Sequence, residues 1–135
     1  MRKFFLSVFI ASLATGCSSS VTEQKPWRGV YSEGFEVSAF TPCGGGKDFW
    51  LYAKQPQVMD DVEKAINKIR AESGYMYPKV YIEFYGVDEG KANDGFAEDY
   101  DAVVSVEKVI SFTTEIPYTC QYWGGIKPPV WWLYA

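Results

Sequence analysis

The sequence predicts a mainly β fold (α+β) with a single amphipathic helix, and three observations support this. Aromatic residues make up 18% of the 135-residue chain, and such residues are enriched in strands. Apolar and polar residues alternate in several stretches, which is the period of a half-buried strand. Only one stretch has the apolar spacing of a helix, and the length of the chain suits one small domain.

The N-terminus has the pattern of a bacterial lipoprotein signal. Arg2 and Lys3 precede an apolar run over residues 4–13, and small residues lead to Cys17. This order is typical of a secretory signal, and the cysteine behind the small residues predicts cleavage before Cys17 and acylation of its thiol. The apolar run has about ten residues, whereas a membrane-spanning helix needs roughly 20. We therefore expect residues 1–16 to be removed and acyl chains, such as palmitate, to anchor Cys17 in the lipid bilayer.

The residue after Cys17 indicates the destination. Ser18 resembles the residue that outer-membrane lipoproteins of Gram-negative bacteria carry at this place, whereas Asp favours retention in the inner membrane. The expected location is the periplasmic face of the outer membrane. An ordinary cleaved signal is the alternative, but it would leave a free thiol in an oxidising compartment. Residues 17–26 are polar and have no period, so they predict a lipidated, flexible tether.

The expected mature chain is acidic. The chain carries 13 Lys and Arg against 17 Asp and Glu, and the loss of Arg2 and Lys3 leaves 11 against 17, a side-chain charge of −6. A negative surface repels nucleic acid and anionic lipid headgroups. We therefore expect no nucleic-acid partner.

The first half of the domain predicts two strands joined by a turn-rich loop. Residues 29–40 interleave apolar and polar side chains and predict the first strand, with Gly34 as a bulge or sharp bend. Residues 41–47 contain a proline and three glycines, which predict a hairpin loop. Residues 48–53 then predict a second strand.

Residues 56–71 predict the helix. Their apolar side chains form a single stripe at helical spacing, made of Val58, Val62, Ala65, Ile66 and Ile69. Pro56 suits the first turn of a helix, where a missing N–H breaks no hydrogen bond. Gly74 predicts the stop, because glycine readily takes the left-handed conformation beyond a helix end.

The second half predicts two further strands around an acidic loop. Residues 79–86 have one apolar face, made of Val80, Ile82 and Phe84. Residues 88–95 are acidic and contain glycine, which predicts a loop. Residues 100–112 predict a fourth strand whose apolar face carries Val104, Val106, Ile110 and Phe112. A fifth, short strand near the C-terminus has only a faint pattern.

Two cysteines remain once Cys17 is lipidated. Cys43 and Cys120 in an exported chain predict a structural disulfide. A redox pair or a metal site is the alternative, but the chain has no CxxC and no His, so the usual ligands of zinc and copper are missing. We expect no metal and no cofactor. Without His, the Ser-His and Cys-His nucleophile pairs are impossible, and we expect a protein that is not an enzyme.

Aromatic side chains form the candidate surfaces for a ligand or partner. Residues 123–135 form an aromatic C-terminal arm with Trp123, Trp131 and Trp132, which either packs on the domain or binds a partner. Other large rings lie on the predicted strands, at Trp50, Tyr81 and Tyr85. Stacked rings of this kind bind sugars or bases.

Short motifs resemble one known family. The run GFEVSAFTPCG (residues 34–44) precedes FWL (49–51), and VYIEFYG (80–86) is followed by a strand that ends before Cys120. Their order is similar to that in the C-terminal OB-like domain of NlpE-like envelope lipoproteins. The resemblance implies a five-stranded, partly open barrel over residues 27–122 with the helix between its middle strands. It also implies links to envelope stress, surface sensing and copper tolerance, but the family's copper-linked CxxC has no counterpart here.

Two functions fit these expectations. The first is a non-catalytic outer-membrane lipoprotein that acts through contacts with another envelope protein, in envelope stress or surface sensing. The second is a periplasmic module that binds a glycan, such as a peptidoglycan fragment, or a small ligand on the open barrel face through Trp50, Tyr81 or Tyr85. OB folds host both kinds of partner, so the fold does not decide between them.

Overall fold

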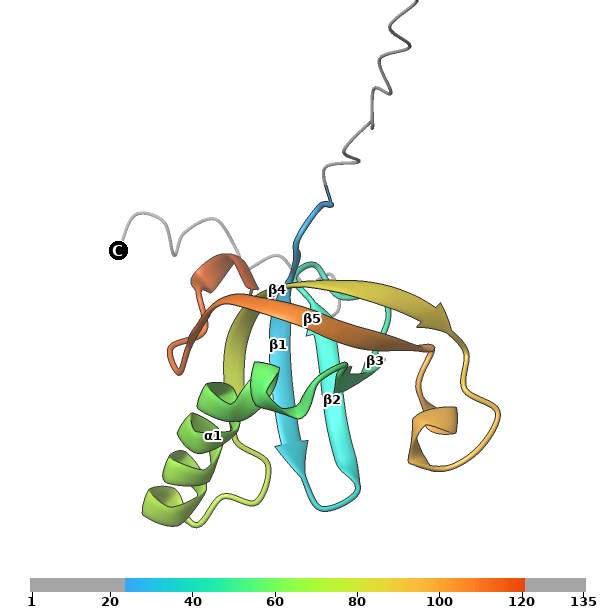
Figure 1. Ribbon diagram of the computed structural model, residues 1–135. Helices are drawn as coiled ribbons and strands as arrows, with labels where there is room; N and C mark the ends of the chain where they lie inside the picture. The colour runs from blue at the N-terminus through green and yellow to red at the C-terminus, as the bar shows by residue number, and fades with distance from the viewer. Residues whose placement is uncertain (1–23, 121–135) are drawn as a thin grey trace, which may run out of the picture.

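The structure, a computed structural model, describes residues 24–120. Five strands close into one barrel in the order β1-β2-β3-β5-β4, and β4 pairs with β1. The strands are β1 (Trp27–Gly34), β2 (Val37–Pro42), β3 (Phe49–Ala53), β4 (Lys79–Gly90) and β5 (Ala102–Thr113). Figure 1 shows β1 and β2 as an upright hairpin that the long β4 and β5 cross.

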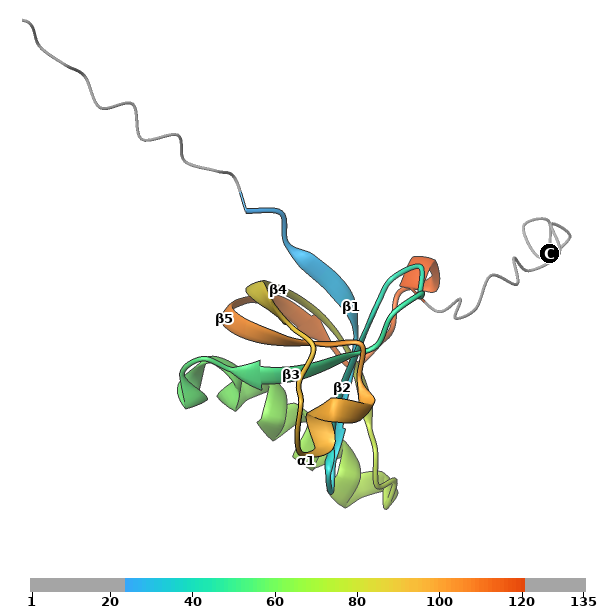
Figure 2. The ribbon, with the colours of Figure 1, turned by 90° about the vertical axis from the view of Figure 1, so that its right-hand side faces the viewer.

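The strand pairing identifies an OB-like fold. β3 and β5 are parallel, and the other neighbouring strands are antiparallel. The helix follows β3 in the chain and covers the end of the barrel at which the β1–β2 hairpin turns (Figures 1 and 2). The expected mainly β fold with five strands and one helix is confirmed. The barrel closes where β4 pairs with β1, and its shortest ladder is the one between β2 and β3.

The first predicted strand is in fact a hairpin. Residues 29–40 contain the β1–β2 turn, in which Gly34 lies opposite Val37 and the turn residues are Phe35 and Glu36. Glu36 has a left-handed φ of 58°. The turn lacks the Asn-Gly or Asp-Gly signal of a tight hairpin, and the alternation of apolar and polar residues continues through it, so the sequence pattern hides the reversal. This division supplies the fifth strand.

The helical segment agrees with its prediction and adds one detail. A 3-10 turn, η1 (Pro56–Met59), leads into α1 (Asp60–Ser73). Gly74 ends the helix as predicted, with a φ of 71° and its N–H bonded to the Arg70 carbonyl. Val62 and Ile66 are buried in the core. Within residues 24–120, no helix is long and apolar enough to cross a membrane.

β4 is longer than predicted, and β5 is less regular. β4 runs on to Gly90, past the expected end at Gly86. β5 contains a bulge, because Glu83 lies opposite Ser111 whereas the next residue, Phe84, lies opposite Val109. Ile110 therefore has no partner across the strand pair. The bulge reverses the alternation of faces, so Ile110 is 42% exposed and its prediction as a core residue is wrong.

The core fills the barrel with the side chains that alternate inward. Val80, Ile82 and Phe84 of β4 are fully buried, as the alternation predicts. Trp27 packs edge-on against Phe49 at 5.2 Å between ring centroids and lies parallel to Phe84 at 6.3 Å. These rings close the end of the barrel at which the described chain begins.

The predicted disulfide is present. Cys43 and Cys120 are bonded, 77 positions apart in the sequence, and Cys120 is buried at the end of η3 (Tyr118–Cys120). The bond ties the β2–β3 loop to the segment after β5. In the loop-entropy account, closing a loop of this length stabilises the fold by about 4.5 kcal/mol. The expected short strand near the C-terminus does not occur between Thr113 and Cys120, and the residues after Cys120 lie outside the described part of the chain.

Candidate functional site

β2 and β3 part from each other early. Their ladder contains two pairs, Ala39 opposite Trp50 and Phe40 opposite Phe49, whereas β1 and β2 share six. β3 continues to Ala53 beyond the last of these pairs. The barrel wall therefore has a gap beside the β1–β2 turn.

A groove of about 410 Å³ occupies this gap, and we call it the β2–β3 groove. Its walls come from the β1–β2 hairpin, from β3 and from the start of the helical segment. The described residues that line it are Tyr31, Glu33, Gly34, Glu36, Val37, Ser38, Trp50, Leu51, Tyr52, Ala53, Met59 and Glu63. In OB folds, the face of the second and third strands and the loop between the first two commonly bind the ligand. The groove lies at this position.

The floor of the groove is a chain of hydroxyl groups. Ser38 Oγ donates a hydrogen bond to the Leu51 carbonyl at 2.5 Å, in place of the ladder that has ended. The Tyr31 hydroxyl lies 3.2 Å from Ser38 Oγ and 3.5 Å from Glu33 Oε2. Because Ser38 donates its one hydroxyl proton to Leu51, Tyr31 donates its own proton to one of these two oxygens. Burial raises the pKa of Tyr31, with a smaller contribution from the nearby Glu33 and Glu63. The phenol therefore stays protonated and is a donor at any physiological pH.

Three carboxylates surround this floor, from Glu33, Glu36 and Glu63. Partial desolvation raises the pKa of Glu63, and repulsion from Glu33 and Asp60 raises it further. None of the described residues that line the groove is a lysine or an arginine. The groove therefore carries a negative potential that a bound cation would neutralise.

Arg70 of α1 reaches the β1–β2 hairpin, but its guanidinium bonds main-chain carbonyls and not the carboxylates of the groove. It donates to the main-chain carbonyls of Glu33 at 2.8 Å and Met76 at 3.3 Å. It also donates to the side chain of Asn67. Arg70 thus fixes the hairpin against the helix and forms no ion pair with the three carboxylates of the groove within residues 24–120.

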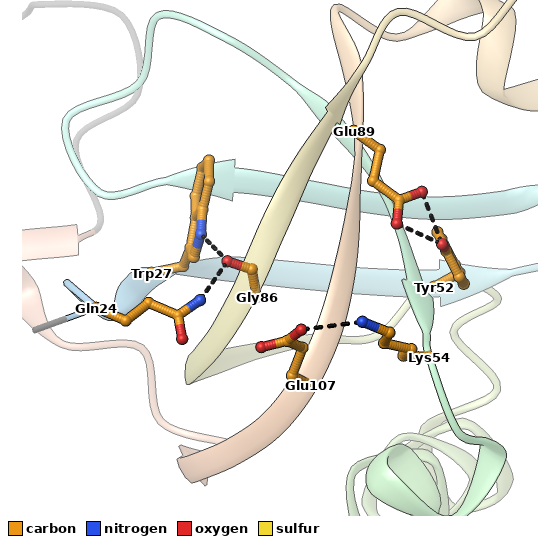
Figure 3. A network of polar contacts seen from close by, with 7 residues as sticks. All are labelled: Gln24, Trp27, Tyr52, Lys54, Gly86, Glu89 and Glu107. Carbon is orange, nitrogen blue, oxygen red and sulfur yellow. Dashed lines mark hydrogen bonds and ion pairs between the residues drawn. The ribbon is translucent and has the colours of Figure 1, made fainter. Parts of the chain in front are cut away.

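Two aromatic rings stand at the rim. Trp50 packs edge-on against Tyr100, with 5.4 Å between ring centroids. Tyr52 is 40% exposed, and its hydroxyl donates to the Glu89 carboxylate at 2.7 Å. Figure 3 shows Tyr52 reaching from β3 to Glu89 on β4, beside the ion pair of Lys54 with Glu107. The hydrogen bond to Glu89 raises the pKa of Tyr52, and both contacts hold the outer side chains of β3 in place.

The structure separates the aromatic residues that the sequence grouped together. Trp50 lines the β2–β3 groove, but Tyr81 and Tyr85 lie on β4, which β5 separates from β3 in the barrel. Tyr81 donates instead to Glu83 at 2.6 Å, beside Arg28. The other candidates, Trp123, Trp131 and Trp132, lie outside the described residues, as does Cys17.

No family model, curated protein or solved structure matches this chain. The OB-like assignment therefore depends on strand order and pairing, and the site depends on its own geometry.

The chemistry of the groove favours binding. Residues 24–120 contain no group of three or more Cys, Asp or Glu side chains placed to hold a metal ion, and Cys43 and Cys120 are bonded to each other. What the groove offers is carboxylate acceptors and aromatic rings, because the hydroxyl protons of Ser38 and Tyr52 are donated to Leu51 and Glu89. These groups recognise polar or cationic ligands.

Sequence reasoning missed most of these residues. Glu36 was expected on a strand and lies in a turn, while Tyr31, Ser38 and Glu63 carry no local motif. Their proximity depends on where the β2–β3 ladder ends and on how the helix covers the barrel. Only the resemblance to an OB-like domain pointed toward this face.

Proposed function

We propose that the protein is a non-catalytic lipoprotein of the outer membrane that acts in the bacterial envelope by binding a protein partner through the β2–β3 groove. The observation that supports this most is the groove itself, an open site with carboxylate acceptors and aromatic rings at the ligand-binding position of an OB-like barrel. Its volume of about 410 Å³ suits a short segment of a partner.

The catalytic inventory supports a binding role. A nucleophile needs an adjacent base, and the chain has no histidine to serve as one. The hydroxyl of Ser38 is instead committed to the Leu51 carbonyl. Contact with a partner fits this arrangement better than turnover of a substrate does.

Site-specific photocrosslinking in intact envelopes tests the proposal. Phe35 is 74% exposed at the β1–β2 turn beside the groove, and Phe96 is 52% exposed on the loop between β4 and β5. A photoreactive phenylalanine analogue at position 35 should crosslink to one envelope protein, and the same analogue at position 96 should not. Identical products from both positions, or none from position 35, would contradict the proposal.

A second candidate is the binding of a glycan, which Trp50 supports because its ring lines the groove. Sugar rings stack on such faces while hydroxyls and carboxylates bind their OH groups. Peptidoglycan fragments should then quench tryptophan fluorescence in the full chain but not in W50F. A flat signal across all fragments would remove this candidate.

A further inference from the structure

We infer that the β2–β3 groove binds an extended peptide segment rich in lysine or arginine, whose main chain pairs with the end of β3 at Ala53. The inference rests on the proposed function and specifies its partner by chemistry. It follows from three features of the groove: the direction of the main chain in β3, the sign of the surrounding charge, and the exposed rings.

The main chain of β3 presents an edge toward the groove. Lys54 N donates to the Val106 carbonyl, so its main-chain groups point toward β5. Directions alternate along a strand, so the groups of Leu51 and Ala53 point the other way, toward β2. The Ser38 contact with the Leu51 carbonyl confirms this direction.

The β2–β3 ladder ends before it reaches Ala53. Leu51 is already engaged by β2, because its carbonyl accepts a hydrogen bond from Ser38 Oγ. The last pair of the ladder is Ala39 with Trp50, and within residues 24–120 no residue of β2 pairs with Ala53. Main-chain groups at an open edge are a template for another strand. Extended peptides bind many domains by adding a strand to such an edge, with the main chain providing affinity and alternate side chains providing specificity.

The charge of the groove selects basic side chains. Glu33, Glu36 and Glu63 line it, and no described lining residue is basic. Partial burial raises the pKa of Glu63, and repulsion from Glu33 raises it further. A lysine or arginine placed between them relieves the repulsion, whereas an acidic peptide or a nucleic acid adds to it.

The rings at the rim suit the same ligand. Tyr52 is 40% exposed next to the open edge of β3, and Trp50 lies beside it on the strand. Cations pack over the faces of such rings, and the methylene stems of lysine and arginine cover apolar surface. The stretch of β3 beyond the ladder is three residues long, about 10 Å of strand, so the recognised segment is short.

Peptide binding to the full chain carrying Cys17→Ser, with its disulfide intact, tests the inference. The probes are two fluorescent peptides that alternate valine with either lysine or glutamate, and a third lysine peptide with alternate amides N-methylated. Fluorescence anisotropy should show binding of the lysine peptide, at least tenfold weaker binding of the N-methylated one, and none of the glutamate peptide. Equal binding of the lysine peptide and its N-methylated form would overturn strand addition.

Charge variants with a matched control locate the site. E33Q/E36Q/E63Q should weaken binding of the lysine peptide at least tenfold, while E72Q/E98Q/E115Q, with the same change in net charge, should stay within twofold. All six side chains lie in the described domain, and the three control positions are exposed and outside the groove. Equal losses in both variants would overturn the groove as the site.

A charge swap guards against a variant that simply misfolds. E33K/E36K should lose the lysine peptide and gain the glutamate peptide, which an unfolded protein would not do. If neither variant nor parent binds any peptide while position 35 still crosslinks to its envelope partner, the inference fails and the proposed function stands. If position 35 also fails to crosslink, both the inference and the proposed function are contradicted.

Discussion

At the scale of single residues, Ser38 explains how the barrel tolerates its gap. Where the pairing of two strands ends, main-chain carbonyls lose their hydrogen-bond donors, and a buried carbonyl without a donor is destabilising. The Ser38 hydroxyl donates to the Leu51 carbonyl, and the Tyr31 hydroxyl lies 3.2 Å from Ser38 Oγ. A side chain of β2 therefore satisfies this acceptor where the main-chain ladder ends, and Ala53 at the end of β3 lies beyond it.

Glu63 gives a prediction about pH. Its pKa is raised in the folded protein by desolvation and by Glu33 and Asp60, so the folded state holds this proton more tightly than the unfolded chain does. Stability from Glu63 is therefore lost as the pH rises through its folded pKa. E63Q should be more stable than the parent at pH 7, by less than about 0.5 kcal/mol because the site is largely exposed, and the gain should vanish at pH 3.5.

Urea unfolding at the two pH values measures the effect. E72Q is the matched control, since Glu72 lies on the same helix next to Lys68, 3.9 Å away. This variant should show no gain at pH 7. A gain for E63Q that is equal at both pH values would contradict the electrostatic explanation.

At the scale of elements, the bulge in β5 decides which residues build the core. Ile82 of β4 is fully buried, whereas Ile110 of the neighbouring β5 is 42% exposed. The difference arises where Glu83 pairs with Ser111 and Phe84 with Val109. The extra residue is Ile110. Its side chain turns outward, and Val109 and Phe112 pack on the core.

Alanine substitution of the two isoleucines tests this assignment. I82A removes a fully buried side chain and should lower the free energy of unfolding by about 2–5 kcal/mol. I110A should change it by less than about 0.5 kcal/mol. Urea titration of both variants, with the disulfide intact, provides the comparison; similar losses would mean that Ile110 is a core residue.

Elements with a strong local pattern were predictable from the sequence. The apolar stripe ending at Ile69, the stop at Gly74 and the buried face of β4 all follow from periodicity within one segment. The β1–β2 turn was not predictable, because it lacks the usual turn residues. The exposure of Ile110 was not predictable either, because it depends on how β5 pairs with β4.

The candidate site was less predictable than the fold. Trp50, a candidate from the sequence, lines the groove. The carboxylates of Glu33 and Glu63 come from a strand and a helix about 30 positions apart, and nothing in either segment signals the other. The gap that joins them results from the length of one ladder, a property of the assembled barrel.

At the scale of the whole molecule, the disulfide and the entry of the chain lie at one end of the barrel. Cys43 N bonds to the Arg28 carbonyl near the start of β1. Gln24 and Trp27 both donate to the Gly86 carbonyl, as Figure 3 shows. These contacts fix the start of β1 firmly against the barrel.

The lipid anchor remains a prediction with a direct measurement. Cys17→Ser removes the thiol that would be acylated, so the protein should move from the membrane to the soluble fraction of the periplasm. Ser18→Asp is the matched control, because it should keep the protein in membranes but shift it from the outer to the inner one. Membrane fractionation distinguishes these outcomes, and a C17S protein that stays in the outer membrane would contradict the anchor.

β1 runs from the end of the barrel at which the described chain begins to the β1–β2 turn (Figure 1), and Gly34 and Glu36 at this turn line the β2–β3 groove. Its eight residues span about 26 Å. Because Gln24 is bonded to Gly86, the stretch from Cys17 to Gln24 adds at most about 25 Å. With Cys17 in the bilayer, as predicted, the groove would sample a shell of periplasm up to about 50 Å deep. A partner would then be met only if its segment enters that shell, and the length of the tether would set the working distance.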